Sequence, residues 1–430
     1  MNMNTHHYDT IIIGGGAAGM MAAGIAAQTG KRVLVVEKNK RIGEKLRITG
    51  GGRCNITNAE NDVHKFLEKY GENNKFLYSP FSQFNNKDTV TFFEKLGLPL
   101  VTQALGRMFP HTEKAGDVCE ALEKFMKQGD VTVLTKSPVT KILQERISPS
   151  YQEGARGSWE KGKITGIIAN GTTYTANSYI LATGGVSHPE TGSTGDGFTW
   201  LRDLGHTVVE PTPSIVPVSV SDAWIKSLAG KSFDNVKITF FINNKKSFTK
   251  TGRILATHFG LSGPMILNSA HQIADLLHEG AVTAEINLFP GQDLGTVERH
   301  IIEVFDANKN KSFKTVFKEF VPVGMGSGII ELVDFIDQDM KVHSITKDAR
   351  KQLVKLLTTL PVHITDLMGF DRAVIADGGI PLEEIDTKTM RSQVAHNLFI
   401  TGDLLHVNRP SGGYSLQLCW TTGYLAGKNA

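Results

Sequence analysis

The glycine-rich segment at residues 14–19 constrains this chain more than any other part of its sequence. It has the pattern G-x-G-x-x-G and separates a short β-branched run, residues 8–13, from a helix of small residues that ends at Gly30. A second apolar run, residues 32–37, follows. A strand, a tight glycine turn, a helix and a second strand in this order predict a βαβ unit of the Rossmann type.

Each marked position of this unit has a physical role in holding a dinucleotide. Gly14 permits the tight turn, Gly16 lets the backbone approach a pyrophosphate, and Gly19 lets the helix pack close to the strand. The start of the helix offers free N–H groups and a positive dipole end to the phosphates. Glu37 is placed to accept hydrogen bonds from a ribose, and its charge disfavours the 2′-phosphate of NADP. The alternative is a glycine-rich turn without a ligand.

The C-terminal end of the chain helps to distinguish FAD from NAD. The run LFITGD predicts a strand that ends at Gly402 and Asp403, and a helix follows Gly412 and Gly413. A carboxylate at such a strand end suits the pyrophosphate or the ribityl chain of FAD. The helix N-terminus suits negative charge at the flavin N1–C2=O edge. A plain NAD enzyme needs no such element. A C-terminal packing helix is the alternative.

The middle of the chain has a different residue pattern from its two ends. The 430 residues are enough for two or three domains. From about Pro211 the runs are strand-like, with an Asn-Asn turn, and residues 296–357 have a charged, helical pattern. The glycine-rich texture returns after about residue 370. This pattern predicts a middle domain inserted into a first domain that both chain ends form.

Charge and cysteine content limit the partners and the compartment. The chain has 46 Lys and Arg against 43 Asp and Glu, a net charge of +3, which gives little support for nucleic acid or a membrane surface. Its three cysteines are far apart and have no metal-ligand spacing, which favours reduced thiols in a cytoplasm. We therefore expect a cytoplasmic protein with a small-molecule substrate, no metal, no nucleic acid and no membrane partner.

Six motifs resemble those of one family. They are TGGGRCNITN (49–58), GRMFPHTEKAGDV (106–118), ILATGGVSHPETGSTGDG (180–197), PTPSIVPV (211–218), THFGLSGPMIL (257–267) and TGDLLHVNRPSGGYSLQLCWTTGYLAG (401–427). In this order they resemble the BaiN/YhiN-like flavoproteins, which include aminoacetone oxidase and 3-dehydro-bile-acid reductase. The resemblance implies FAD and an α/β architecture. It comprises a Rossmann-type FAD domain (1–212 and 371–430), an inserted β-rich, barrel-like domain (213–290 and 345–370) and a helical subdomain (291–344).

The expected cofactor-binding residues come from the glycine turn, the second strand, the three-glycine segment at residues 50–52, the strand-like run around residue 139, the motif at residues 180–197 and the C-terminal motif. They are Gly14, Gly16, Ala17, Ala18, Gly19, Glu37, Lys38, Gly51, Gly52, Arg53, Cys54, Asn55, Val139, Thr183, Gly184, Gly402, Asp403, Gly412, Gly413 and Tyr414. Three adjacent glycines suit backbone that lies against a cofactor with no Cβ in the way.

Catalytic residues are harder to predict, because a flavin performs the redox chemistry itself. Arg53 is expected near the flavin, with an ion pair as the alternative. His258 and Tyr414 are further candidates, each with a structural role as its alternative. Cys54 is expected to be a packed thiol, because no second cysteine lies nearby in the sequence. The loop at residues 406–409 faces either the substrate or solvent.

The segment GMGSG at residues 324–328 resembles a second nucleotide-binding loop, but no buried strand precedes it, so we expect a loop between helices.

Taken together, these features favour an FAD-dependent oxidoreductase that transfers a hydride through flavin N5. The preferred reaction is reduction of a conjugated double bond, with NAD(P)H as a transient reductant. The alternatives are an aminoacetone-like amine oxidase that uses O2, and a non-catalytic FAD-binding partner or sensor protein.

Overall fold

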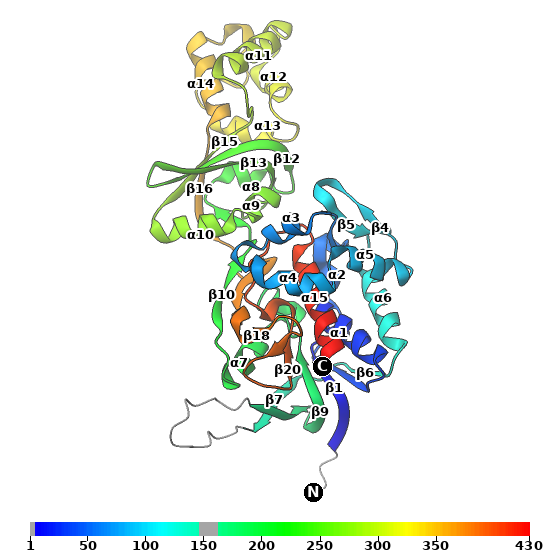
Figure 1. The fold of residues 1–430 in the computed structure, drawn as a ribbon. Helices are drawn as coiled ribbons and strands as arrows, with labels where there is room; N and C mark the ends of the chain where they lie inside the picture. Colours follow the sequence, from blue (N-terminus) through cyan, green and yellow to red (C-terminus); the bar gives the residue numbers. More distant parts are fainter. Residues whose placement is uncertain (1–4, 146–161) are drawn as a thin grey trace. The chain divides into compact units, whose positions relative to one another are not determined.

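The chain forms two compact units in the computed structural model, which describes residues 5–145 and 162–430. The chain-end unit consists of Met1–Thr212 and Val374–Ala430, and the inserted unit is Pro213–Ala373 (Figure 1). Each unit has its own large apolar core. No helix among the described residues is long and apolar enough to cross a membrane.

A parallel sheet forms the centre of the chain-end unit. Its central strand β1 (Thr5–Ile13) pairs with β2 (Val33–Val36) on one side and with β9 (Thr172–Leu181) on the other. The sheet continues from β2 to β6 (Val131–Leu134) and from β9 to β20 (Leu398–Ile400), all in parallel. Because β1 and β2 lie in parallel with a helix between them in the chain, the predicted Rossmann βαβ unit is confirmed.

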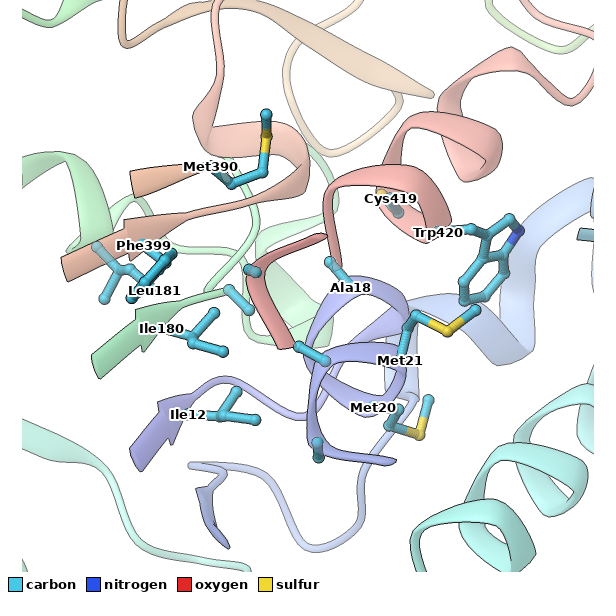
Figure 2. Close-up of a cluster of buried hydrophobic side chains, with 14 of the residues drawn as sticks. Ile12, Ala18, Met20, Met21, Ile180, Leu181, Met390, Phe399, Cys419 and Trp420 are labelled. Carbon is cyan, nitrogen blue, oxygen red and sulfur yellow. The ribbon is translucent and has the colours of Figure 1, made fainter. Parts of the chain in front are cut away.

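Two helices from opposite ends of the chain pack together. Helix α1 (Ala17–Gln28) and helix α15 (Tyr414–Asn429) meet through glycines, and buried side chains of both helices share one apolar cluster (Figure 2). A Cβ on Gly423 would lie 2.5 Å from the Ala18 carbonyl oxygen, and one on Gly427 would lie 2.4 Å from that of Ala22. Only glycine permits this approach of the two backbones.

Shorter elements surround this centre. Asn170 (φ +48°) and Gly171 (φ +75°) turn the hairpin between β8 and β9, as an Asn-Gly turn predicts. The other helices and strands of the chain-end unit are α2 (Glu44–Gly52), β3 (Thr57–Asn58), α3 (Val63–Glu68), α4 (Asn74–Gln83), α5 (Asn86–Lys95), β4 (Leu100–Thr102), β5 (Arg107–Pro110), α6 (Ala115–Lys127), β7 (Val139–Glu145), β8 (Lys163–Ala169), α7 (Asp196–Asp203), β10 (Val209–Ser214), β17 (Ile375–Gly379), β18 (Ile385–Asp386) and β19 (Arg391–Ser392).

The inserted unit is a closed barrel with helices. The barrel order is β11 (Val218–Val220), β14 (Gly260–Ser262), β13 (Lys245–Ala256), β12 (Ser232–Ile242), β15 (Val282–Asn287) and β16 (Leu360–Leu367). The helices are α8 (Ala223–Ser227), α9 (Pro264–Leu267), α10 (Ala270–Glu279), α11 (Leu294–Ala307), α12 (Phe313–Phe320), α13 (Gly326–Ile329) and α14 (Lys347–Thr358). One apolar cluster includes Ile238 of the barrel and Phe317 of α12, so barrel and helices share a core.

The segment at residues 324–328 corrects one expectation. It was predicted as a loop between helices, but only its first residues form a turn, with Gly324 at φ +90°, and α13 begins at Gly326. A Cβ on Gly328 would lie 2.6 Å from the Trp224 carbonyl oxygen, so this glycine packs against α8. Gly324 therefore serves the turn, and Gly328 serves helix packing.

The glycine contact between α1 and α15 yields a stability prediction. Gly423→Ala should lower the free energy of unfolding of the chain-end unit by about 1–3 kcal/mol, because two backbones would have to separate. Gly116→Ala in α6 is the matched control, since its Cβ would meet its nearest neighbour, Arg47 Nη1, at an ordinary 3.6 Å. Urea unfolding followed by circular dichroism measures both. Equal stability of the two variants would contradict the proposed contact.

Candidate functional site

The three glycines of the first turn have different surroundings. A Cβ on Gly14, whose φ is +105°, would lie 2.4 Å from the Ala182 carbonyl oxygen, and one on Gly19 would lie 2.0 Å from that of Gly14. Gly16 has an ordinary φ of −82°, and no atom of the described residues would come within 4 Å of its Cβ. Gly14 and Gly19 are therefore required by packing, whereas Gly16 borders open space at the start of α1.

Both chain-end helices begin at a glycine. The N-caps of α1 and α15 are Gly16 and Gly413, and a glycine has no side chain that could cap its helix. The first N–H groups of each helix therefore remain available to a ligand. Because Gly423 faces Ala18 and Gly427 faces Ala22, the two helices run in the same direction.

The offset between these two helix starts suits an extended cofactor. Ala18 is one residue inside α1, whereas Gly423 is nine residues inside α15. Helix α15 therefore begins about eight residues, or about 12 Å at 1.5 Å per residue, beyond the start of α1. This spacing allows one helix start to face a pyrophosphate while the other faces the far end of the same molecule.

Glu37 fixes the glycine turn to the end of β2. Its buried carboxylate accepts hydrogen bonds from the N–H groups of Gly15 and Asn39, at 2.8 Å in both cases. Carboxylate oxygens can each accept more than one hydrogen bond, so a ribose contact stays possible and stays a prediction. The adjacent Lys38 pairs through Nζ with Asp196 Oδ2 at 2.8 Å.

The three-glycine segment interrupts α2. Residues 44–48 are helical, but Thr49, Gly50 and Gly51 leave the helical conformation. Gly50, Gly51 and Gly52 have φ values of +58°, +67° and +85°, which only glycine adopts readily. For Gly51 and Gly52, a Cβ would have no neighbour within 4 Å among the residues that the structure describes. The segment therefore presents backbone to open space, as a cofactor-binding loop requires.

Asn55 provides an independent sign of a ligand. Its Oδ1 atom is buried and has no hydrogen-bond partner among the described residues. A buried amide oxygen without a partner is unfavourable, by about 1–3 kcal/mol. A donor on a bound cofactor would satisfy it. Together with the open space at Gly16, this orphaned oxygen shows that the residues present fit FAD.

Arg53 lies in an ion pair. Its Nη1 atom is 3.5 Å from Glu113 Oε2 and 3.4 Å from Gln103 Oε1, and its guanidinium stacks over Phe109 with 4.6 Å to the ring centroid. The side chain is 41 % exposed. This geometry matches the ion-pair alternative that the sequence left open, and a flavin contact stays a prediction.

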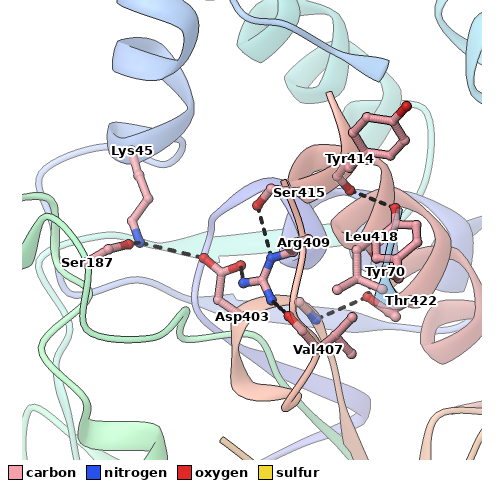
Figure 3. A network of polar contacts seen from close by, with 11 residues as sticks. Lys45, Tyr70, Ser187, Asp403, Val407, Arg409, Tyr414, Ser415, Leu418 and Thr422 are labelled. Atoms are coloured by element: carbon pink, nitrogen blue, oxygen red, sulfur yellow. Dashed lines mark hydrogen bonds and ion pairs between the residues drawn. The ribbon is translucent and has the colours of Figure 1, made fainter. Parts of the chain in front are cut away.

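Asp403 is the centre of a charged network at the end of β20 (Figure 3). Arg409 Nη2 donates to its Oδ1 at 2.5 Å, and Lys45 Nζ lies 3.8 Å from its Oδ2. Arg409 is only 1 % exposed and also donates to the Val407 carbonyl at 2.6 Å and to Ser415 Oγ at 3.3 Å. Lys45 hydrogen-bonds Ser187 Oγ at 3.2 Å.

The opposite charges within the network oppose the effect of burial on the pKa values of Asp403 and Lys45. Burial alone would raise the pKa of Asp403, but the charges of Arg409 and Lys45 outweigh it and leave that pKa below its usual value. Burial lowers the pKa of Lys45, and the negative charge of Asp403 opposes this effect. Asp403 therefore stays ionised at neutral pH. The sequence placed Asp403 correctly at a strand end but gave no partner for it, and the solvent-loop interpretation is wrong at Arg409.

Tyr414 is held mainly as a core residue. Its carbonyl accepts a hydrogen bond from the Tyr70 hydroxyl at 2.9 Å, and its ring centroid lies 4.8 Å from that of Phe66. Its neighbour Gly413 needs φ +101°, and a Cβ there would lie 2.3 Å from the Thr57 carbonyl oxygen. Asn58 Nδ2 donates to the Gly412 carbonyl at 3.1 Å. Strand β3 thus fixes the start of α15.

The remaining predicted residues are distributed over both units. Thr183 and Gly184 follow β9, and a Cβ on Gly184 would lie 2.6 Å from Ser193 Oγ. Val139 begins β7 and pairs with Ala169 of β8. His258 belongs to the inserted unit, between β13 and β14, where its ring lies 4.9 Å from that of Phe259. The role of His258 stays a prediction.

The cysteines are structural thiols. Cys54, Cys119 and Cys419 are free and buried. Burial raises the pKa of Cys54 and of Cys419 to about 12, and that of Cys119 to about 11. A thiol in this state is a poor nucleophile, which agrees with the expected packing role. Within residues 5–145 and 162–430, no cluster of three His, Cys, Asp or Glu side chains could hold a metal ion.

The parallel sheet, the open glycine turn and the carboxylate at the end of β2 define a dinucleotide-binding protein of the Rossmann type. The chain matches the HI0933-like protein Rossmann domain over residues 8–429, and it belongs to that family. The match confirms the resemblance found in the sequence and makes the chain an FAD-dependent oxidoreductase.

Relatives and solved structures agree with this assignment. The chain is 30% identical over 426 residues to the 3-dehydro-bile acid delta(4,6)-reductase of Clostridium scindens, covering 97% of this chain and 98% of that protein. It is 30% identical over 422 residues to the ribosomal RNA dihydrouridine synthase of Haemophilus influenzae, with 98% of each covered.

Among solved structures, a 3-ketosteroid-delta4-(5alpha)-dehydrogenase from Rhodococcus jostii RHA1 shares the fold. Its TM-score is 0.52 at 14% identity, and the alignment covers 99% of this chain and 96% of that chain.

Gly16→Val tests the cofactor site. The new side chain fits the φ of −82° and enters space that no described residue fills, so the protein without cofactor should lose only the cost of a poorer N-cap, about 1 kcal/mol. FAD affinity should fall by about a hundredfold or more, which corresponds to about 2.8 kcal/mol. Fluorescence titration with FAD measures the affinity, and Gly116→Ala is the control. Full FAD affinity in Gly16→Val would place the cofactor elsewhere.

The buried thiols give a chemical prediction. In the folded protein at pH 8, a disulfide reagent such as dithionitrobenzoate should not label the cysteines rapidly, because burial keeps them protonated and inaccessible. All three should react after unfolding in guanidinium. The absorbance of the released thionitrobenzoate follows the reaction. Fast labelling of one thiol in the folded protein, mapped to Cys54, would restore a redox role for that residue.

Proposed function

We propose that this protein reduces a carbon–carbon double bond conjugated to a carbonyl group in a small organic substrate, with NAD(P)H as the electron donor. Bound FAD would supply hydride transfer at its N5 atom. The protein contributes the position of the cofactor and the charges around it. The first N–H groups of α1 are free to bind the pyrophosphate, and the backbone at Gly51 and Gly52 is free to lie against the cofactor.

The observation that carries the proposal is the chemistry shared by two relatives over nearly the whole chain. One is named for reduction of the Δ4,6 unsaturation of a 3-dehydro bile acid, and the other for making dihydrouridine in ribosomal RNA. A 3-oxo group next to a 4,6-diene is a conjugated carbonyl system. Uridine becomes dihydrouridine when a ring double bond conjugated to a carbonyl is saturated. Both names thus describe a reaction at a carbon–carbon double bond conjugated to a carbonyl group, in different molecules.

A small substrate fits the charge of this chain better than RNA does. A protein that binds RNA gains much of its affinity from phosphates, and it usually carries a clear positive excess. Here the excess is +3 in 430 residues. The sequence motifs also left open an amine oxidase and a non-catalytic FAD-binding protein. Each of these alternatives predicts a different response to electron donors and acceptors.

An anaerobic stopped-flow experiment tests the proposal. NADH or NADPH should bleach the flavin absorbance, and a steroid 4-en-3-one should restore it about tenfold faster or more than its saturated 3-ketone, a difference of about 1.4 kcal/mol in activation free energy. The saturated ketone is the matched control, because it has the same ring skeleton and carbonyl without the conjugated bond.

The other outcomes contradict the proposal in distinguishable ways. Bleaching by aminoacetone but not by NADH or NADPH would identify an amine oxidase. Bleaching by NAD(P)H with reoxidation only by unmodified ribosomal RNA would support reduction of this type of double bond but would contradict a small organic substrate. No bleaching by any donor would indicate a protein that binds FAD without turnover.

A further inference from the structure

Three charged side chains from distant segments meet beside the start of α15. Lys45 comes from α2, Asp403 follows β20, and Arg409 lies in the loop before α15 (Figure 3). Asp403 Oδ1 accepts a hydrogen bond from Arg409 Nη2 at 2.5 Å, and Asp403 Oδ2 lies 3.8 Å from Lys45 Nζ. Two cations share one carboxylate, so the group carries one excess positive charge.

Within the described residues, no second acid forms an ion pair with Lys45 or Arg409 to balance this excess positive charge. The ion pairs of Lys45 and Arg409 in this part of the chain both go to Asp403. The next acid, Glu190, is well exposed and pairs with His188 at 2.8 Å. Arg409 is almost fully buried and has Asp403 as its counter-charge, so Lys45 carries the excess, and its burial makes an unbalanced charge unfavourable. An anion supplied from outside the chain would relieve this imbalance.

The excess charge lies where α15 adds to it. Arg409 Nε donates to Ser415 Oγ in the first turn of α15, at 3.3 Å. The N-terminus of a helix carries a partial positive charge, which acts in the same direction as the guanidinium. Lys45 Nζ extends the positive region toward Gly184, since a Cβ added to Gly184 would lie 3.8 Å from Nζ. Gly184, Asp403 and the start of α15 are all predicted cofactor contacts.

We propose that the Lys45–Asp403–Arg409 network stabilises the negative charge that bound FAD gains on reduction, and so raises its reduction potential. A hydride delivers one proton and two electrons, so its addition to the neutral flavin ring leaves one negative charge on the ring, while the donor loses the hydride. Lys45 and Arg409 act as positioning residues that set the field, and Asp403 holds them in place. The inference rests on the proposed function only through FAD binding at this site.

The midpoint potential of bound FAD tests this proposal without a substrate. Lys45→Met should lower the potential by about 30 mV or more, the equivalent of a tenfold loss in a two-electron equilibrium. Asp403→Asn should raise it, because the network loses its only carboxylate. Arg41→Met is the matched control. It removes a cation four residues before Lys45 in the sequence that is 60 % exposed and pairs with Glu44, and it should leave the potential unchanged.

Equilibration with a reference dye at pH 7 gives the potentials, and sulfite affinity at the flavin gives a second reading, since that adduct also places negative charge on the ring. Lys45→Met should weaken sulfite binding about tenfold, the same 1.4 kcal/mol. Lys45→Gln replaces it if the methionine variant does not fold. Potentials of the Lys45 and Arg41 variants that equal the wild-type value would overturn this inference alone. A protein that binds no FAD would contradict the proposed function as well.

Discussion

The close contact between α1 and α15 is the interaction on which the rest of the cofactor site depends. Gly423 and Gly427 allow the backbones of the two helices to meet at Ala18 and Ala22, where a methyl group would lie within 2.5 Å of a carbonyl oxygen. This contact joins segments about 400 residues apart in sequence. It sets how far the start of α15 lies beyond the start of α1, and that offset decides which end of a dinucleotide each helix can face.

The sequence could predict those parts of the site whose causes are local. A glycine turn between a strand and a helix, an acid at the end of the next strand and an Asn-Gly hairpin each depend on a few adjacent residues. For that reason, β1, α1, β2 and the turn at Asn170 agree with expectation. Helix α15 was expected for similar reasons, since Gly413 precedes it and apolar residues follow at helical spacing.

Burial and long-range partners could not be predicted in the same way. Nothing local shows that Arg409 is buried against Asp403, because the loop between them returns to the strand end only in three dimensions. The available signal was a basic residue six positions after the acid and just before the paired glycines. The partner of Arg53 was equally hidden, because Glu113 lies 60 residues away. The orphaned oxygen of Asn55 is visible only once its surroundings are known.

The division into two cores offers a physical reason why one family can act on different molecules. The cofactor-binding residues predicted from the sequence lie in the chain-end unit, which has its own apolar core. The glycine turn and α15 pack within that core, and the barrel of the inserted unit has a separate one. The two relatives are named for reactions on a bile acid and on ribosomal RNA, and both match nearly the whole chain.

The central claim is that the chain-end unit holds FAD between the starts of α1 and α15. Mass spectrometry of the small molecule released on denaturation, combined with the visible spectrum of the folded protein, tests it most directly. The account predicts a yellow protein that releases FAD in a one-to-one ratio and takes it up again after removal. A colourless protein that takes up no FAD, or one that releases only a nicotinamide dinucleotide, would contradict it.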